Sequence, residues 1–354
     1  MTALDRTLTT SLPLRRGSEG FNTSQDYLVK GLIPAEALCS IYGPGGSLKS
    51  FLAVSLACHI ASGTSWGGRR VNQGAVLFIA GEGGTGVSRR IRAWELSVND
   101  EMALDNLFRV DCPIFPAAPG SIEQVILAAK DIQNMTGMPV RLIILDTLAR
   151  CFGNSDENTE RDMGAFIQGC DAIRYHTRAA MMLVHHSGKD QERGARGSSA
   201  FQAALDAEFN VRREGRRNAI TLSCTKMKDA EMPEVTAYDL EEVVIYIDSD
   251  GEPVTSLVLN DEPRQPDDDL LSSGIPPGVP HITRNHTVLW RCINQRISQN
   301  KPCTRALLRD DLRAKGINVE KKFSRWLEKL IREGLIFVNG EEIKLNHYNF
   351  NNYS

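Results

Sequence analysis

Residues 43–50 read GPGGSLKS, a glycine-rich stretch that ends in a lysine followed by a serine. Loops of the pattern G-x-x-x-x-G-K-[ST] hold phosphates, because their backbone N–H groups converge on the anion at the amino end of a helix. The lysine reaches the β- and γ-phosphates and the hydroxyl binds Mg²⁺, roles that would fall here to Lys49 and Ser50. One position departs from the pattern, since Leu48 stands where the second glycine is expected.

The surroundings of this stretch favour a working phosphate-binding loop over a chance glycine-rich turn. The buried-strand pattern LCSIYG precedes it and a helical pattern, SFLAVSLACHIASG, follows it. A positive φ at Leu48 would cost about 1–2 kcal/mol, less than nucleotide binding can supply. We expect Gly43, Gly45 and Gly46 to adopt the unusual dihedral angles of such a loop. The predicted nucleotide-binding residues are Gly43, Pro44, Gly45, Gly46, Ser47, Leu48, Lys49, Ser50 and Phe51.

Two carboxylates that follow apolar runs are candidates for the remaining chemistry of phosphoryl transfer. Asp146 ends the run RLIILD, and the carboxyl end of a strand is where open α/β sheets place ligands. We predict that Asp146 serves the metal; a helix-capping aspartate is the alternative. Glu82 follows the run VLFIAG. We predict that it activates the attacking water, on the expectation that its strand lies beside the strand of the loop; a polar turn residue is the alternative.

Adjacent histidines close another predicted strand, AAMMLVHHSG. Because side chains alternate along a strand, only one of His185 and His186 should face the nucleotide. We favour His186 as the group that senses the γ-phosphate; a buried, hydrogen-bonded histidine is the alternative. The polar, basic segment 187–199 follows, and we interpret it as a loop that contacts nucleic acid, the alternative being a solvated surface loop.

A pair of lysines, Lys226 and Lys228, alternates in the sequence CTKMKDAE near the end of a predicted strand. Alternation directs both side chains the same way. We predict that they act as fingers that insert into the nucleotide site of a neighbouring subunit. Arg212 and Arg213 are second choices for that role, and an exposed, charged strand end is the alternative interpretation.

These motifs together resemble those of RecA-like AAA-family ATPases of phages and plasmids, related to the hexameric replicative helicase RepA and more distantly to DnaB-type helicases and RecA. The resemblance covers about residues 28–248. The matching stretches, in family order, are YGPGGSLKSFLAVSLACHIASG, LFIAGEGG, LIILDTLAR, LVHHSGK, RGSSAFQAALD and TKMKD.

The resemblance implies hydrolysis of ATP, with Mg²⁺, at the subunit interfaces of a hexameric ring. By it Lys49 and Ser50 bind phosphate and metal, Glu82 is the base and Asp146 the metal-side carboxylate. It also makes His186 the sensor, and Lys226 and Lys228 the trans-acting fingers. The sequence departs from the family at Leu48 and near Asp206, the position at which RepA carries its arginine finger.

Around these motifs the apolar runs and helical patterns alternate, which predicts an α/β fold with a mostly parallel sheet. Three strand-like segments, AEFNVRRE, NAITLSCTK and VVIYIDS, then follow with short turns and predict an antiparallel extension. The expected strands are 38–43, 74–83, 141–147 and 179–188, and the expected helices are 50–63, 86–97, 121–136 and 159–177.

Composition divides the chain into four parts. We expect a flexible arm over 1–27, the ATPase domain over 28–248, a linker over 249–280 and a winged helix–turn–helix-like domain over 281–354. Residues 248–280 hold eight acidic residues, one arginine and six prolines, whereas residues 281–335 hold thirteen Lys/Arg and five Asp/Glu. The last of three helical patterns is a candidate recognition helix, and its residues are Lys321, Lys322 and Arg325 toward DNA and Trp326, Leu327 and Leu330 toward the core. Partner docking or oligomerisation is the alternative for this domain.

The whole chain has 354 residues, a formal net charge of −3 and eight scattered cysteines, which we interpret as reduced residues of a cytoplasmic protein. Neither secretion nor membrane insertion is expected. We predict an ATP-driven ring that acts on single-stranded DNA, with replication-initiation or primase partners. An ATP-dependent DNA-binding switch is the first alternative, and a non-enzymatic winged-helix regulator is the second.

Overall fold

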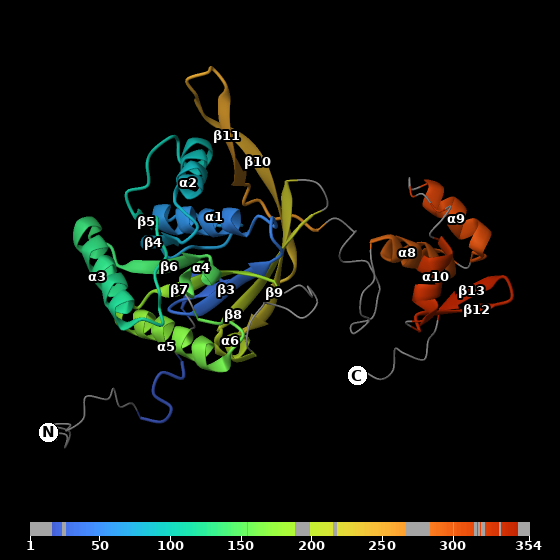
Figure 1. The fold of residues 1–354 in the computed structure, drawn as a ribbon, viewed down its shortest axis with the longest axis horizontal. Helices are drawn as coiled ribbons and strands as arrows, with labels where there is room; N and C mark the ends of the chain where they lie inside the picture. Colours follow the sequence, from blue (N-terminus) through green and yellow to red (C-terminus); the bar gives the residue numbers. More distant parts are fainter. Residues whose placement is uncertain are drawn as a thin grey trace.

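The structure is a computed structural model, and it describes residues 16–22, 26–153, 155–187, 199–214, 218–266, 284–299, 301–314, 317, 319, 323–332 and 334–345. Its centre is a nine-stranded sheet of order β11-β10-β9-β8-β3-β7-β6-β4-β5 (Figure 1). The strands are β3 (Leu38–Gly43), β4 (Ala75–Ala80), β5 (Leu107–Val110), β6 (Val140–Asp146), β7 (Ala180–His186), β8 (Ala207–Arg213), β9 (Ala219–Met227), β10 (Thr236–Ile247) and β11 (Pro253–Leu259).

The mostly parallel sheet is confirmed, but the predicted start of the antiparallel extension is wrong: AEFNVRRE forms β8, which pairs in parallel with β3. Strands β3 to β8 pair in parallel, whereas β9, β10 and β11 continue from β8 in antiparallel pairs. The central parallel strands are apolar along nearly their whole length, because helices cover both of their faces. A short antiparallel pair, β1 (Tyr27–Val29) and β2 (Ile33–Pro34), precedes β3.

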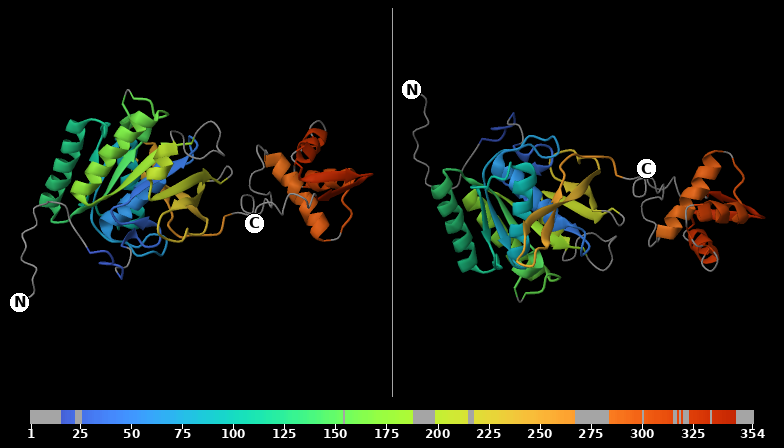
Figure 2. Two further views of the ribbon diagram at one scale, coloured as in Figure 1. Left: turned by 90° about the horizontal axis from the view of Figure 1, so that it is seen from below. Right: turned by 90° about the horizontal axis from the view of Figure 1, so that it is seen from above.

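Helices pack on both faces of the sheet (Figures 1 and 2). Helices α1 (Lys49–Ser62) and α2 (Thr85–Val98) share one hydrophobic core with β3 and the antiparallel strands. Helices α3 (Pro119–Thr136) and α5 (Glu160–Thr177) contribute to the core on the opposite face. The shorter helices α4 (Leu148–Cys151) and α6 (Ser199–Ala204) follow β6 and precede β8. None of the described helices is both long and apolar enough to cross a bilayer.

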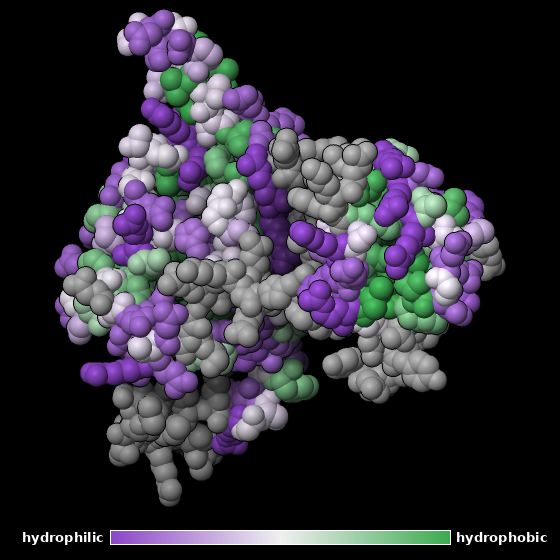
Figure 3. All heavy atoms as spheres, turned by 45° about the vertical axis from the view of Figure 1, so that its right-hand side comes forward, coloured by the Kyte–Doolittle hydropathy of each residue, from purple (hydrophilic) through white to green (hydrophobic). Residues whose placement is uncertain are grey.

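Two further expectations about the sheet are wrong. Strand β4 does not lie beside β3, because β7 and β6 stand between them. The linker does not begin at residue 249, because β11 pairs with β10, and its Val258 and Leu259 join the core that also contains α1. Strands β10 and β11 form a hairpin that projects past α2 (Figure 1), and its outer end is hydrophilic (Figure 3). The charge of that polar turn, which includes Asp248, Asp250 and Glu252, explains why the sequence looked like a linker.

The C-terminal segment builds a separate core from three helices and a hairpin, which are α8 (Arg284–Ser298), α9 (Arg305–Ala314), α10 (Phe323–Arg332), β12 (Ile336–Asn339) and β13 (Glu342–Leu345). Trp326, Leu327 and Leu330 of α10 are buried in this core, as expected, and Arg325 is exposed. Lys321 and Lys322 lie outside the described residues. Asn339 pairs with Glu342, so the hairpin turns through residues 340–341.

Candidate functional site

In the loop between β3 and α1, the residues with positive φ are not the ones that the sequence predicted. Gly46 has a φ of 74° and Leu48 has a φ of 65° and a ψ of 21°, so the leucine does adopt the left-handed conformation. Gly43 does not adopt a positive φ. A glycine is nevertheless required at position 43, because a Cβ would lie 2.1 Å from the carbonyl oxygen of Val211 on β8. The expectation of unusual dihedrals at Gly43 and Gly45 is therefore wrong, and the Leu48 side chain packs against the core beside α1.

Lys49, the first residue of α1, folds back over this loop. Its Nζ donates to the carbonyl oxygens of Gly43 at 2.9 Å and Pro44 at 2.7 Å, and lies 3.4 Å from Ser47 Oγ. Burial lowers the pKa of Lys49 to about 8, against the attraction of Asp146 and Glu82. A buried ammonium that neutral carbonyls satisfy is poised to exchange them for phosphate oxygens, which stabilise its charge more strongly.

Asp146 and Ser50 form the metal side of the site. Asp146 ends β6 close to Ser50 at the start of α1, near enough for the Ser50 hydroxyl to stabilise the carboxylate charge. Burial raises the pKa of Asp146, whereas the Ser50 hydroxyl and the cations Arg90 and Lys49 lower it. A carboxylate and a hydroxyl at neighbouring positions supply the hard oxygen donors that Mg²⁺ prefers. Together with the loop, these residues fit a nucleoside triphosphate bound with Mg²⁺.

Glu82 reaches the same edge of the sheet by a different route than expected. Strand β4 pairs with β6, and the N–H of Gly81 donates to the Asp146 carbonyl at 2.8 Å. Glu82 Oε1 accepts a hydrogen bond from Thr147 Oγ1 at 3.2 Å, and it lies 4.0 Å from Arg150 Nε. The carboxylate thus stands next to Asp146 rather than next to β3, and its charge still acts on Lys49.

The adjacent histidines at the end of β7 separate as alternation requires. His186 stands opposite Gly43 in the parallel pairing of β7 and β3. This pairing places His186 beside the start of the phosphate loop, and burial, and then the charge of Lys49, lower its pKa. His185 is buried on the other face, where its ring lies 5.6 Å from that of Phe201. The segment expected to contact nucleic acid, 187–199, lies mostly outside the described residues.

One cation at the site was missed by the sequence analysis. The guanidinium of Arg90 on α2 lies 4.5 Å from the ring centroid of Phe51, which fixes it over the start of α1. Burial lowers the pKa of Arg90, and Asp146 and Glu82 oppose that shift by attraction. The run SRRIRAW signals a basic helix, but only packing selects which arginine turns inward.

The predicted finger lysines are not brought to this site. Strand β9 runs antiparallel to β8, so Met227 pairs with Ala207 at the start of β8. There the Lys228 N–H donates to the carbonyl of Asp206, whose carboxylate accepts from the N–H of Leu38. Leu38 and Gly43 are opposite ends of β3, about 17 Å apart in an extended strand. Lys228 therefore lies at the far edge of the sheet from the phosphate loop of its own chain.

The second-choice fingers, Arg212 and Arg213, end β8 at the edge that holds the loop. Arg212 Nε donates to Asn210 Oδ1 at 2.9 Å, and Arg213 Nη2 donates to Asn218 Oδ1 at 2.9 Å. Both guanidinium groups thus have acceptors on β8 itself or just before β9.

A family model described as an AAA domain matches residues 6–192 of the sequence. The chain belongs to this family. This AAA-domain protein is an ATPase of the AAA/RecA-like kind with a RecA-like P-loop fold, and nucleotide binding follows from the family. The matched stretch contains Lys49, Glu82, Asp146 and His186, and it ends before Lys226 and Lys228.

Proposed function

We propose that this AAA-domain ATPase is a ring-forming motor on single-stranded DNA, a helicase of the phage or plasmid replication type. The convergence of Lys49, Ser50 and Asp146 with Glu82 and His186 at one edge of the sheet is the observation that carries the proposal. Nucleotide hydrolysis in such a site is mostly positioning and charge stabilisation, and these side chains supply both.

In this proposal the loop N–H groups and Lys49 hold the β- and γ-phosphates of ATP. Ser50 and Asp146 hold Mg²⁺, which when bound neutralises charge on the phosphate oxygens. Glu82 accepts a proton from the water that attacks the γ-phosphorus, and the bond to the ADP oxygen breaks. Thr147 orients the Glu82 carboxylate through its hydrogen bond. His186 hydrogen-bonds the γ-phosphate and senses its release at the end of β7.

Assembly into a ring, hexameric by resemblance, is supported by where the cations lie. The lysines near residue 227 are out of reach of their own phosphate loop, so they can assist hydrolysis only at a neighbour's site. In a closed ring of identical subunits, every interface would join the phosphate loop of one subunit to the lysines of the next.

Binding of DNA is proposed for the C-terminal helices and hairpin, as a winged-helix-like module. Its basic excess supports phosphate contacts, and Arg325 is exposed on α10, the helix whose opposite face fills the core. Partners from replication initiation or priming remain part of the proposal through the resemblance alone.

The test measures ATP hydrolysis and solution mass together, with and without single-stranded DNA. A hexamer whose hydrolysis DNA stimulates supports the motor, and a monomer without turnover overturns it. A strand-displacement assay on a forked duplex then separates the motor from an ATP-dependent DNA-binding switch, because the switch would hydrolyse ATP without displacing the strand.

A further inference from the structure

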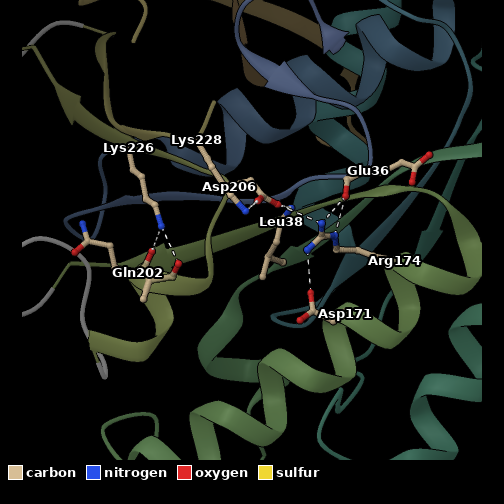
Figure 4. Close-up of polar contacts among 9 residues, drawn as sticks. Glu36, Leu38, Asp171, Arg174, Gln202, Asp206, Lys226 and Lys228 are labelled. Atoms are coloured by element: carbon tan, nitrogen blue, oxygen red, sulfur yellow. Dashed lines mark hydrogen bonds and ion pairs between the residues drawn. The ribbon is translucent and has the colours of Figure 1, made fainter. Parts of the chain in front are cut away.

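Lys226 and Lys228 have different surroundings, although both side chains turn toward residues 202–206, which comprise the end of α6 and the connection to β8 (Figure 4). We propose that they have different jobs: Lys226 clamps α6 to the sheet, and Lys228 alone is the catalytic finger that reaches a neighbour's ATP. This inference rests on the proposed function, because it assigns roles within a ring.

Lys226 is engaged with its own chain. Its Nζ donates to the carbonyl oxygens of Gln202 at 2.7 Å and Ala203 at 2.9 Å, in the last turn of α6. Carbonyls at the carboxyl end of a helix lack partners within the helix and carry partial negative charge, so a lysine satisfies both needs. Moving Lys226 to a neighbour would leave those two carbonyls without this donor.

A buried network beneath α6 reinforces this clamp. Gln202 Nε2 donates to Glu208 Oε2 at 2.9 Å, and the hydroxyl of Thr225 donates to the same oxygen at 2.8 Å. Glu208 is fully buried on β8, and its register partner across the sheet is Lys226. The Glu208 carboxylate thus links α6, through Gln202, to β9, the strand that carries Lys226, through Thr225.

Lys228 is held far more loosely. Its side chain is 62% exposed, and among the described residues its ammonium pairs with Asp206 Oδ1 at 3.8 Å. A long ion pair to an exposed ammonium contributes little and is easily exchanged. Lys228 can therefore leave for a phosphate at little cost, whereas Lys226 cannot.

Asp206 is held in place by its own hydrogen bonds, and it sets the resting position of the Lys228 side chain. Its Oδ2 accepts from the N–H of Leu38 at 2.9 Å and from Arg174 Nη2 at 3.2 Å. Arg174 is anchored in turn by the carbonyl of Glu36, at 2.8 Å from Nε and 2.6 Å from Nη2 (Figure 4). This chain of contacts makes Asp206 a positioning residue for the Lys228 ammonium.

The experiment compares Lys226→Met with Lys228→Met in the full chain. Lys228→Met should lower kcat at least a hundredfold without changing the melting temperature, as expected for a lost transition-state contact. Lys226→Met should lower the melting temperature and lower kcat less than tenfold. Hydrogen exchange over residues 199–206 should quicken in Lys226→Met alone, a readout that needs neither a ring nor ATP.

Trans action is tested by mixing Lys228→Met with Lys49→Ala subunits in equal amounts. Each pure variant should be inactive, and the mixture should recover up to about a quarter of wild-type hydrolysis, the share of interfaces in a ring that join an intact loop to an intact finger. Asp206→Asn keeps an acceptor for Leu38 while removing the charge. Because the 3.8 Å pair with Lys228 contributes little, this change should lower kcat no more than about threefold, with KM for ATP unchanged.

Two results would overturn the inference: equal kcat losses for the two methionine variants at unchanged melting temperatures, or no recovery in the mixture. A wild-type protein that lacks hydrolysis would instead defeat the proposed function, and the exchange data would still decide whether Lys226 clamps α6.

Discussion

The two edges of the parallel sheet treat their lysines differently. At the carboxyl edge Lys49 is buried over its own loop, and burial lowers its pKa to about 8 beside Asp146 and Glu82. At the amino edge Lys228 is exposed and weakly paired. A site assembled within one chain needs cations held in advance, whereas a contribution to another subunit needs a cation that can leave. The following predictions test that contrast.

The largest effect is expected at the carboxyl edge. Lys49→Ala should lower kcat for ATP hydrolysis by more than about a hundredfold, because the transferring phosphoryl group loses its buried cation. A steady-state phosphate-release assay measures it. Lys30→Ala, which removes an exposed lysine near β1, is the matched control and should leave hydrolysis unchanged.

Glu82→Gln separates binding from chemistry at the same edge. The amide keeps an acceptor for Thr147 but cannot take a proton, so kcat should fall about 10²–10⁴-fold while ATP still binds. Calorimetric titration with ATP and single-turnover hydrolysis measure the two parts. Retained turnover in this variant, with Glu123→Gln as the exposed control on α3, would remove Glu82 from the role of base.

The low pKa of Lys49 predicts a pH dependence of ATP affinity. In the ligand-free protein the ammonium loses its proton as the pH rises through about 8, and bound phosphate favours the charged form. Binding above that pH must therefore take up a proton, and Kd should be roughly tenfold weaker at pH 9 than at pH 7. Lys49→Arg should bind with a flat profile over this range, because arginine keeps its charge. A wild-type Kd that does not change would contradict the burial argument.

The smallest effect is expected at Leu48. Leu48→Gly relieves about 1–2 kcal/mol of left-handed strain and loses the packing of the side chain against the core, terms of similar size. ATP affinity should be preserved or improved. Leu48→Ala keeps the strain and loses the packing, so it should melt at a lower temperature than the glycine variant. A large loss of affinity in Leu48→Gly would show that the leucine is required.

Local sequence determined the parallel strands, the helices between them and the phosphate loop. Buried parallel strands are continuous apolar runs, and a loop that binds phosphate needs its lysine and serine at fixed spacing. The alternation of side chains along a strand also predicted that His185 and His186 face opposite sides of the sheet. These signals lie within a few residues of one another, so they can be recognised without knowing what packs against them.

Tertiary structure decided what depends on neighbours distant in sequence. Strand order placed Glu82 beside Asp146 rather than beside β3. Pairing with β10 made residues 253–259, in a stretch that the sequence predicted as an acidic linker, the edge strand β11. Packing against Phe51 turned Arg90 inward, and the carbonyls of α6 captured Lys226 but not Lys228. Each outcome is a contact across many residues, and no local pattern encodes which of several similar side chains will make it.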